Sequence, residues 1–294
     1  MATPASPTKI NTQFSAQDAD ITIQSSDGVL FKLHRQNLGT NTGGFPGMEI
    51  STQEEIVHLP EPAKVLEIVF QFVYPKKHPK LKGLDFGTIL EVSEAVEKYE
   101  VFAAMNICEI RLHEFPPDRA ANVFVHAIKH EYPELINKTA VLFCRYPALD
   151  LIKGLGLPAH CIIPWLQYQA AWQEIFDNVT QYIERLKADT QCTFATLKKG
   201  NSIHNICGIC RMSLLCHVAR LSRIETLSSL NEALESPRLL VDKIDKYSWC
   251  DSCTSTTATC GVYAPIIRNT LQAAVAAIPP FTHFLKVNTA GRPK

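Results

Sequence analysis

The stretch that decides the fold of this chain is residues 19–38, ADITIQSSDGVLFKLHRQNL. The dipeptide Asp27-Gly28 divides it into two runs in which apolar and polar residues alternate. The apolar positions of these runs are Ile21, Ile23, Val29, Phe31 and Leu33. Both residues of an Asp-Gly pair tolerate positive φ, so this dipeptide between alternating runs is the strongest short signal for a β-hairpin. His34-Arg35-x-x-Leu38 follows at helical spacing, which predicts a hairpin that leads directly into a helix.

Working outward from the hairpin, the pattern predicts further elements as far as residue 115. Residues 37–48 are rich in Gly, Asn and Thr, so we expect a short helix that gives way to a loop. Residues 55–59, EIVHL, are predicted to form a third strand, which Pro60 ends. Three helices are then predicted, over residues 62–74, from the N-cap Asp85 to Tyr99, and over residues 102–112.

This order of elements resembles the BTB (POZ) domain over residues 18–115. The spacing Asp-Gly-x-x-Phe-x-x-His-Arg-x-x-Leu carries the resemblance at the hairpin, and FVYP at residues 72–75 and EKYEV at residues 97–101 carry it further along. Together with IPPF at residues 278–281, these motifs are similar to those of BTB proteins from mushroom-forming fungi. The resemblance implies a small sheet capped by helices, within an α+β chain.

The resemblance also implies roles for five residues. Asp20 and Arg35 would be the charged pair that lines the family's pocket, and an unpaired buried charge is costly, so we expect them to pair. Phe31, His34 and Leu38 would form the core between hairpin and helix. The alternative is that these five residues serve only as scaffold.

BTB domains act by non-covalent assembly, as homodimers or heterodimers. Many are substrate adaptors for cullin-3 ubiquitin ligases, and others join transcriptional complexes. The resemblance therefore implies an interaction or adaptor protein whose partners are other proteins, with a second copy of the chain and cullin-3 as candidates. It implies no enzymatic activity.

The composition divides the chain into three parts. Residues 1–17 are rich in Ala, Thr, Pro, Ser and Gln and lack the pattern of a signal peptide, so we expect a disordered tail. Residues 18–115 form the predicted BTB domain, which Pro116-Pro117 ends. Residues 118–294 are predicted to be an α-helical domain with a Cys-rich segment over residues 192–260.

A long helix is predicted from Pro164 onward. Its apolar residues recur at alternating steps of three and four, at Trp165, Tyr168, Trp172, Ile175, Val179, Tyr182 and Leu186. This spacing fits a coiled coil or partner-binding helix, and it also fits the core stripe of a helical domain. Phe176 and Ile183 widen the stripe, which favours the core.

The Cys-rich segment contains two C-x-x-C pairs, Cys207/Cys210 and Cys250/Cys253. Two such turns can complete a tetrahedral, structural zinc site. Unmetallated thiols are an equally supported interpretation, whereas a redox dithiol is disfavoured because no βαβ pattern surrounds either pair. Three cysteines that precede this segment lie singly within apolar stretches, at Cys108, Cys144 and Cys161. They are predicted to be small buried residues.

The chain has a formal net charge of zero and a pI near 7.1. A neutral chain argues against a broad surface for nucleic acid, where clustered Lys and Arg must neutralise phosphates. A transcription-associated regulator that uses a zinc-binding Cys-rich segment remains the second hypothesis. No apolar run approaches the ~20 residues that cross a membrane, so we expect a soluble protein of the cytoplasm or nucleus.

An enzyme is the third hypothesis. The sequence contains no G-x-S-x-G, phosphate-binding Gly loop or H-E-x-x-H motif. His126 and His130 lie one helical turn apart and could bind a metal. The favoured interpretation is a pair of histidines on a polar helix face.

Overall fold

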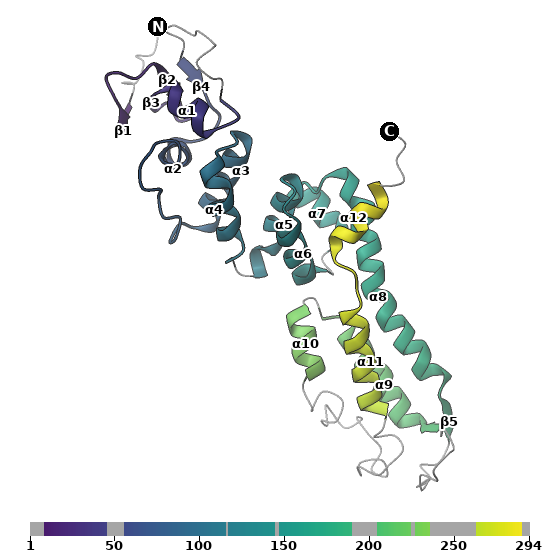
Figure 1. Cartoon of the computed structure of the whole chain (residues 1–294). Helices are drawn as coiled ribbons and strands as arrows, with labels where there is room; N and C mark the ends of the chain where they lie inside the picture. The colour runs from purple at the N-terminus through teal and green to yellow at the C-terminus, as the bar shows by residue number, and fades with distance from the viewer. Residues whose placement is uncertain are drawn as a thin grey trace, which may run out of the picture. The chain divides into compact units, whose positions relative to one another are not determined.

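The computed structural model describes most of the chain, in seven stretches (Figure 1). These are residues 9–45, 56–115, 117–144, 147–189, 205–224, 227–235 and 263–289. The chain divides into two compact units. Unit 1 comprises Met1–Arg119 and His126–Leu135, and unit 2 comprises Ala120–Val125 and Ile136–Lys294. The sequence had placed the boundary near residue 116, whereas the structure also assigns His126–Leu135 to unit 1.

Unit 1 begins with a four-stranded mixed sheet in the order β1-β3-β2-β4. Its strands are β1 (Ile10–Ser15), β2 (Ile21–Gln24), β3 (Leu30–Leu33) and β4 (Ile56–His58). β2 and β3 form the predicted hairpin, in which Ile21 pairs with Leu33 and Ile23 with Phe31. The turn uses Gly28 at φ 82°, a conformation that glycine adopts without strain. β1 pairs with β3, and β4 with β2, in parallel.

β1 lies inside the segment predicted to be a disordered tail, so that prediction is wrong for Ile10–Ser15. The Phe14 side chain is buried, and its ring centroid lies 5.9 Å from those of Phe31 and Phe70. Asn11 donates a hydrogen bond to Glu67 Oε2 at 2.8 Å. The Ser, Thr and Gln content of the tail concealed a strand in which only Ile10 and Phe14 are apolar.

Unit 1 contains the helices α1 (Arg35–Asn41), α2 (Ala63–Gln71), α3 (Phe86–Lys98) and α4 (Phe102–Leu112), followed by a 3-10 turn at Pro117–Arg119. Helix α2 packs on the sheet of this unit through Phe70, α3 packs on α2, and α4 packs on α3. Asp85 caps α3 as predicted, because its Oδ1 accepts the Thr88 N–H at 3.0 Å. Unit 1 is therefore an α+β arrangement of a small sheet and helices.

The Gly-rich run after α1 packs tightly against the turn between α3 and α4. The Gly43 N–H donates to the Glu100 carbonyl at 3.1 Å, and the Gly44 N–H donates to the Tyr99 carbonyl at 3.0 Å. A Cβ at Gly44 would lie 2.6 Å from Tyr99 Cα, closer than such contacts allow. Phe45 then stacks on Tyr99 with ring centroids 4.6 Å apart. The glycine therefore permits a close approach of two backbones.

Unit 2 is mostly helical. Its helices are α7 (Ala148–Leu155), α8 (Ile162–Arg185), α9 (Gly208–Leu221), α10 (Leu227–Glu235), α11 (Tyr263–Ala276) and α12 (Phe281–Thr289), with 3-10 turns at Val141–Phe143 and Ala159–Cys161. The residues of α5 (Ala120–Lys129) and α6 (Pro133–Ala140) are divided between the two units. β5 (Lys187–Asp189) and β6 (Asn205–Cys207) form a parallel pair, which the all-helical prediction for this region did not include.

The long helix α8 supplies the core of unit 2. Helices α9, α11 and α12 pack against it (Figure 1). Trp165 is fully buried, with the rings of Phe124, Phe143 and Phe281 at centroid distances of 5.1 to 5.5 Å. The seam residue Tyr182 is 41% exposed, whereas Ile183 is buried. The predicted heptad seam is therefore mainly a core stripe.

Candidate functional site

Asp20 and Arg35 lie side by side where the hairpin meets α1. Asp20 Oδ1 accepts the Arg35 backbone N–H at 2.7 Å, and the Asp20 carbonyl accepts Arg35 Nε at 3.4 Å. In each of these two hydrogen bonds, one partner is a backbone group and the other is a side-chain group. Arg35 is buried and Asp20 is exposed. The Asp20 carboxylate thus satisfies an N–H in the first turn of α1, which needs an outside acceptor.

The other three predicted interaction residues lie nearby. Phe31 and Leu38 are buried in the core of unit 1. The His34 N–H donates to Tyr74 Oη at 3.1 Å, and His34 Nδ1 lies 3.0 Å from the same oxygen. His34 Nε2 lies 3.3 Å from a carboxylate oxygen of Asp18. Burial raises the pKa of Tyr74, so its hydroxyl keeps its proton. All three residues fix the position of α1.

A second polar cluster in unit 1 consists of Glu94, His126 and His130. Glu94 projects from α3, His126 lies in α5, and His130 follows the last residue of α5. His126 Nδ1 lies 2.9 Å from Glu94 Oε1, and His130 Nε2 lies 3.2 Å from Glu94 Oε2. His126 is only 2% exposed. The prediction that His126 lies on a polar, solvent-facing side of its helix is therefore wrong. The ring is buried, and Glu94 provides the hydrogen-bond partner that a buried imidazole needs.

Charged and polar groups surround this cluster. Lys129 Nζ lies 3.5 Å from Glu94 Oε1. Glu97, one turn beyond Glu94 on α3, accepts a hydrogen bond from Tyr132 Oη and lies 3.8 Å from His130 Nδ1. Glu131 has φ 60°, and this left-handed residue turns the chain back so that Tyr132 reaches α3. Both glutamates therefore lie among side chains of the α5 segment.

Electrostatics favour an ionised carboxylate at the centre of the cluster. Hydrogen bonds from His126, and then from His130, hold the pKa of Glu94 far below its usual range, although burial opposes them. Burial and the neighbouring Glu97 raise the pKa of Tyr132, so this phenol stays protonated as a donor. The two ring nitrogens and a Glu94 oxygen lie within 4.8 Å of one another. Imidazole nitrogen with carboxylate oxygen is a ligand set for transition metals.

Sequence reasoning found the two histidines but missed Glu94. The spacing of His126 and His130 places both rings on one side of α5. Glu94 is 32 residues away from His126 on another helix, and no local pattern pairs the two. The available signal was the matching i, i+3 spacing of Glu94 and Glu97, which gives α3 an acidic side.

The predicted zinc cysteines lie largely outside the described residues. Cys250 and Cys253 are not among them, and of Cys207 only the backbone in β6 is described. Cys210 is buried in α9. The prediction of small buried thiols is confirmed for Cys108, Cys144 and Cys161. Burial raises the pKa of Cys108 and of Cys161 to about 11, so these two are unreactive thiols.

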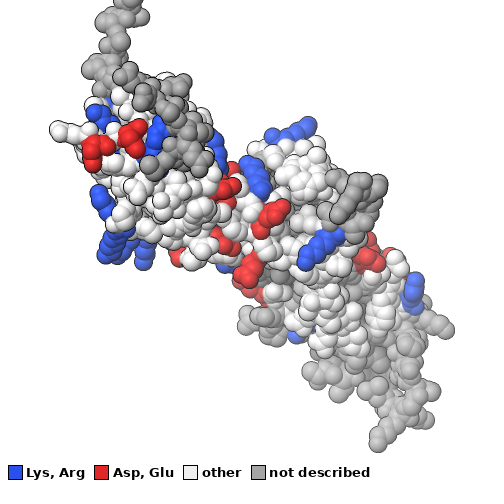
Figure 2. All heavy atoms as spheres, turned by 45° about the horizontal axis from the view of Figure 1, so that its top comes forward, with Lys and Arg blue, Asp and Glu red and all other residues white. Residues whose placement is uncertain are grey.

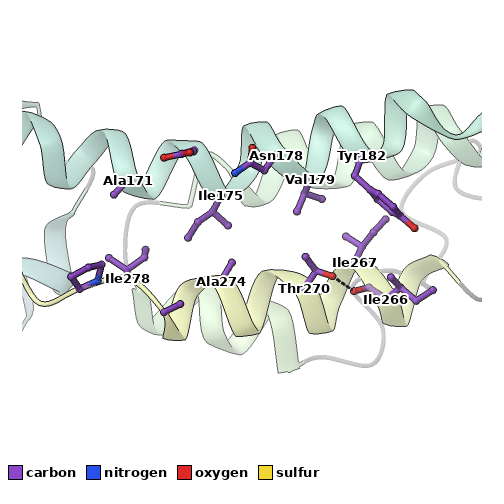
Figure 3. Close-up of a pocket in the computed structure, with 13 residues that line it drawn as sticks. Ala171, Ile175, Asn178, Val179, Tyr182, Ile266, Ile267, Thr270, Ala274 and Ile278 are labelled. Carbon is purple, nitrogen blue, oxygen red and sulfur yellow. Dashed lines mark hydrogen bonds between the residues drawn. The ribbon is translucent and has the colours of Figure 1, made fainter.

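Unit 2 contains an apolar groove of about 560 Å³ between α8 and α11 (Figure 3). Ile175 and Val179 of α8 face Ile267 and Ala274 of α11 across it. The polar side chains Asn178 and Thr270 also line it, and the Thr270 hydroxyl donates to the Ile266 carbonyl at 2.8 Å. A groove of this size and lining can hold apolar groups of a ligand.

On the face that Figure 2 shows, the charged side chains of the described residues form no broad basic area. Lys and Arg occur there in small groups among Asp and Glu, with large uncharged areas between them. None of the helices in the described part of the chain has the length and apolar character needed to cross a membrane.

Comparison with known proteins gives no assignment: no family model matches the chain, and no curated protein matches it. The likeness of residues 18–115 to the BTB domain therefore rests on the sequence motifs and on the order of the elements.

Proposed function

We propose that this chain is a protein-interaction adaptor whose unit 1 is a BTB-type domain. The observation that supports this most is the element order β2, β3, α1, β4, α2, α3, α4. It equals the order of strands and helices that the resemblance implies for residues 18–115. Phe31 and Leu38 lie in the core, and Asp20 contacts Arg35 where the hairpin enters α1.

Helix α4 offers a surface for such contacts. Phe102 is 54% exposed and Ile110 is 60% exposed. These residues are eight positions apart, which places them on similar sides of the helix. Exposed apolar side chains on one helix side are suited to a protein partner, since burial on binding removes them from water. We propose that this side of α4 takes part in assembly, with a second copy of the chain or with cullin-3.

Affinity purification of the full chain with mass spectrometry tests the proposal, together with light scattering for self-association. We expect cullin-3 or a second copy of the chain to be recovered. The double variant Phe102→Asp/Ile110→Asp should lose the contact while circular dichroism stays unchanged. Leu149→Asp is the matched control, because Leu149 is an equally exposed apolar residue in unit 2. A monomeric chain that captures no cullin-3 would contradict the proposal.

Asp20→Asn is a further control for the same experiment. The amide oxygen of Asn still accepts a hydrogen bond, so the contact with the Arg35 N–H is expected to persist. Loss of assembly in this variant, with the fold intact, would assign the Asp20 charge itself to partner contact. Unchanged assembly would assign Asp20 to the scaffold.

A further inference from the structure

We propose that Glu94, His126 and His130 bind a divalent transition metal ion, with Zn²⁺ as the best fit. This goes beyond the proposed function and does not depend on it. The three side chains contribute two imidazole nitrogens and one carboxylate oxygen within 4.8 Å of one another. All three residues belong to unit 1. The structure has therefore already gathered three ligand atoms of the types that zinc prefers.

A second carboxylate, that of Glu97, lies beside His130. A metal-binding histidine usually directs its second ring N–H to a carboxylate, which fixes the tautomer and the ring orientation. His130 approaches this arrangement, since Nε2 faces Glu94 and Nδ1 lies 3.8 Å from Glu97 Oε2, which is within ion-pair range but longer than a hydrogen bond. Tyr132 holds Glu97 through a hydrogen bond from its hydroxyl. His130 is thus oriented to offer Nε2 as the ligand atom.

The three ligand side chains differ in burial, and the most exposed side leaves room for a fourth ligand of the metal ion. The His126 side chain is 1% exposed and that of His130 is 20% exposed, whereas that of Glu94 is 38% exposed. Solvent therefore reaches the cluster from the Glu94 side. A zinc ion with three protein ligands takes its fourth ligand from water. Mg²⁺ and Ca²⁺ prefer oxygen ligands, so two imidazoles select against them.

Lys129 competes with the proposed metal ion. Its Nζ lies 3.5 Å from Glu94 Oε1, where it contributes positive charge beside the ligand set. The Lys129 side chain is 46% exposed and can move into solvent when a metal ion binds. Removing this charge should therefore tighten metal binding. A Lys129 variant that merely disturbed the fold would weaken zinc binding instead.

Calorimetric titration of the chelator-treated full chain with Zn²⁺ tests the proposal. We expect the wild type to bind one more equivalent of zinc than His130→Gln or Glu94→Gln, and Mg²⁺ to give no binding at this site. Any zinc held by the C-x-x-C pairs contributes equally to wild type and variants, because these substitutions leave the cysteines unchanged. His160→Gln, at an exposed histidine of unit 2, is the matched control and should bind as the wild type does.

Two more variants separate a metal site from a structural polar cluster. Glu97→Gln should weaken zinc binding by about 10- to 100-fold, because it removes the carboxylate that orients His130. Lys129→Gln should tighten zinc binding, whereas its control Lys153→Gln should not change it. Equal zinc uptake by wild type, His130→Gln and Lys129→Gln would overturn the proposal. If His130→Gln does not fold, the test rests on Lys129→Gln. A zinc affinity of Lys129→Gln equal to that of the wild type would then contradict the proposal.

Discussion

A carboxylate network in unit 1 and a ring cluster in unit 2 join elements by different kinds of contact. In unit 1, the carboxylates of Glu61, Glu94 and Glu97 join elements by accepting hydrogen bonds from Lys, Tyr and His side chains. In unit 2, Trp165 packs among aromatic rings, and its indole Nε1 has no hydrogen-bond partner among the residues that the structure describes. Polar contacts depend on protonation, whereas ring packing depends on shape. We therefore expect pH to act on these carboxylate contacts of unit 1, and loss of volume to act on the ring cluster around Trp165 in unit 2.

The largest effect is expected for Trp165→Ala in unit 2. The fully buried ring leaves a cavity, so we expect a loss of about 3–5 kcal/mol in the free energy of unfolding. Urea unfolding followed by circular dichroism measures it. Trp165→Phe is the control, and it should cost much less, because it keeps most of the ring volume and removes the unpaired N–H. A loss below about 1 kcal/mol for Trp165→Ala would show that the surrounding rings collapse to fill the space.

The next largest effect is expected for Gly44→Ala in unit 1. The new Cβ would meet the Tyr99 backbone at 2.6 Å, so two chain segments must move apart, at a cost of about 1–3 kcal/mol. Gly154→Ala in α7 is the matched control. Nothing lies within 4 Å of its Cβ position, so we expect a gain of about 0.4–1 kcal/mol from the reduced entropy of the unfolded chain. Opposite signs in the same unfolding experiment support a close backbone contact at Gly44.

The contact between Gly44 and Tyr99 shows how far sequence reasoning reaches. Local patterns predicted the hairpin, the Asp85 cap and the helices of residues 62–112, because side-chain period and capping chemistry are encoded locally. They suggested only a loop for the Gly-rich run. Its docking on Tyr99 is a contact between residues more than 50 positions apart. No local pattern specifies such a contact.

A smaller effect is expected for Tyr99→Phe. The Tyr99 hydroxyl donates to Glu61 Oε2 at 2.5 Å, and its loss should cost about 1.5 kcal/mol, since the acceptor is charged. Burial and Glu61 raise the pKa of Tyr99 above its usual value of 10.0. This contribution is present below pH 10 and is lost as pH rises further, because ionisation then favours the unfolded chain. Tyr99→Phe should therefore flatten the alkaline side of the stability profile, and an unchanged profile would contradict this role.

The smallest effect concerns the exposed cap Asp85. Hydrogen bonds from the Thr88 side chain and N–H lower the pKa of Asp85 from 3.8 to about 2. Its contribution to stability is therefore present above pH 4 and disappears as pH falls towards 2. Asp85→Asn should lower stability at pH 7 and much less at pH 2, measured by thermal unfolding. Equal differences at both pH values would show that the charge is not involved.

The candidate metal cluster marks a second limit of sequence reasoning. The helical period placed His126 and His130 on one side of α5, but it could not show whether that side faces water or another helix. The structure places α3 there, and Glu94 turns a pair of histidines into a three-residue set. The cysteine pairs are the converse case. Their spacing is the stronger motif, and two of the four lie outside the described residues.

The strand β1 also determines where this chain can be shortened. A chain begun at residue 18, as the sequence composition would suggest, loses Phe14 from beside Phe31 and Phe70. It also leaves one side of β3 without its neighbour, since β1 is the outer strand of the sheet. A newly exposed edge can pair with the same edge of another molecule and so promote aggregation. Expression trials should therefore begin at or before residue 9.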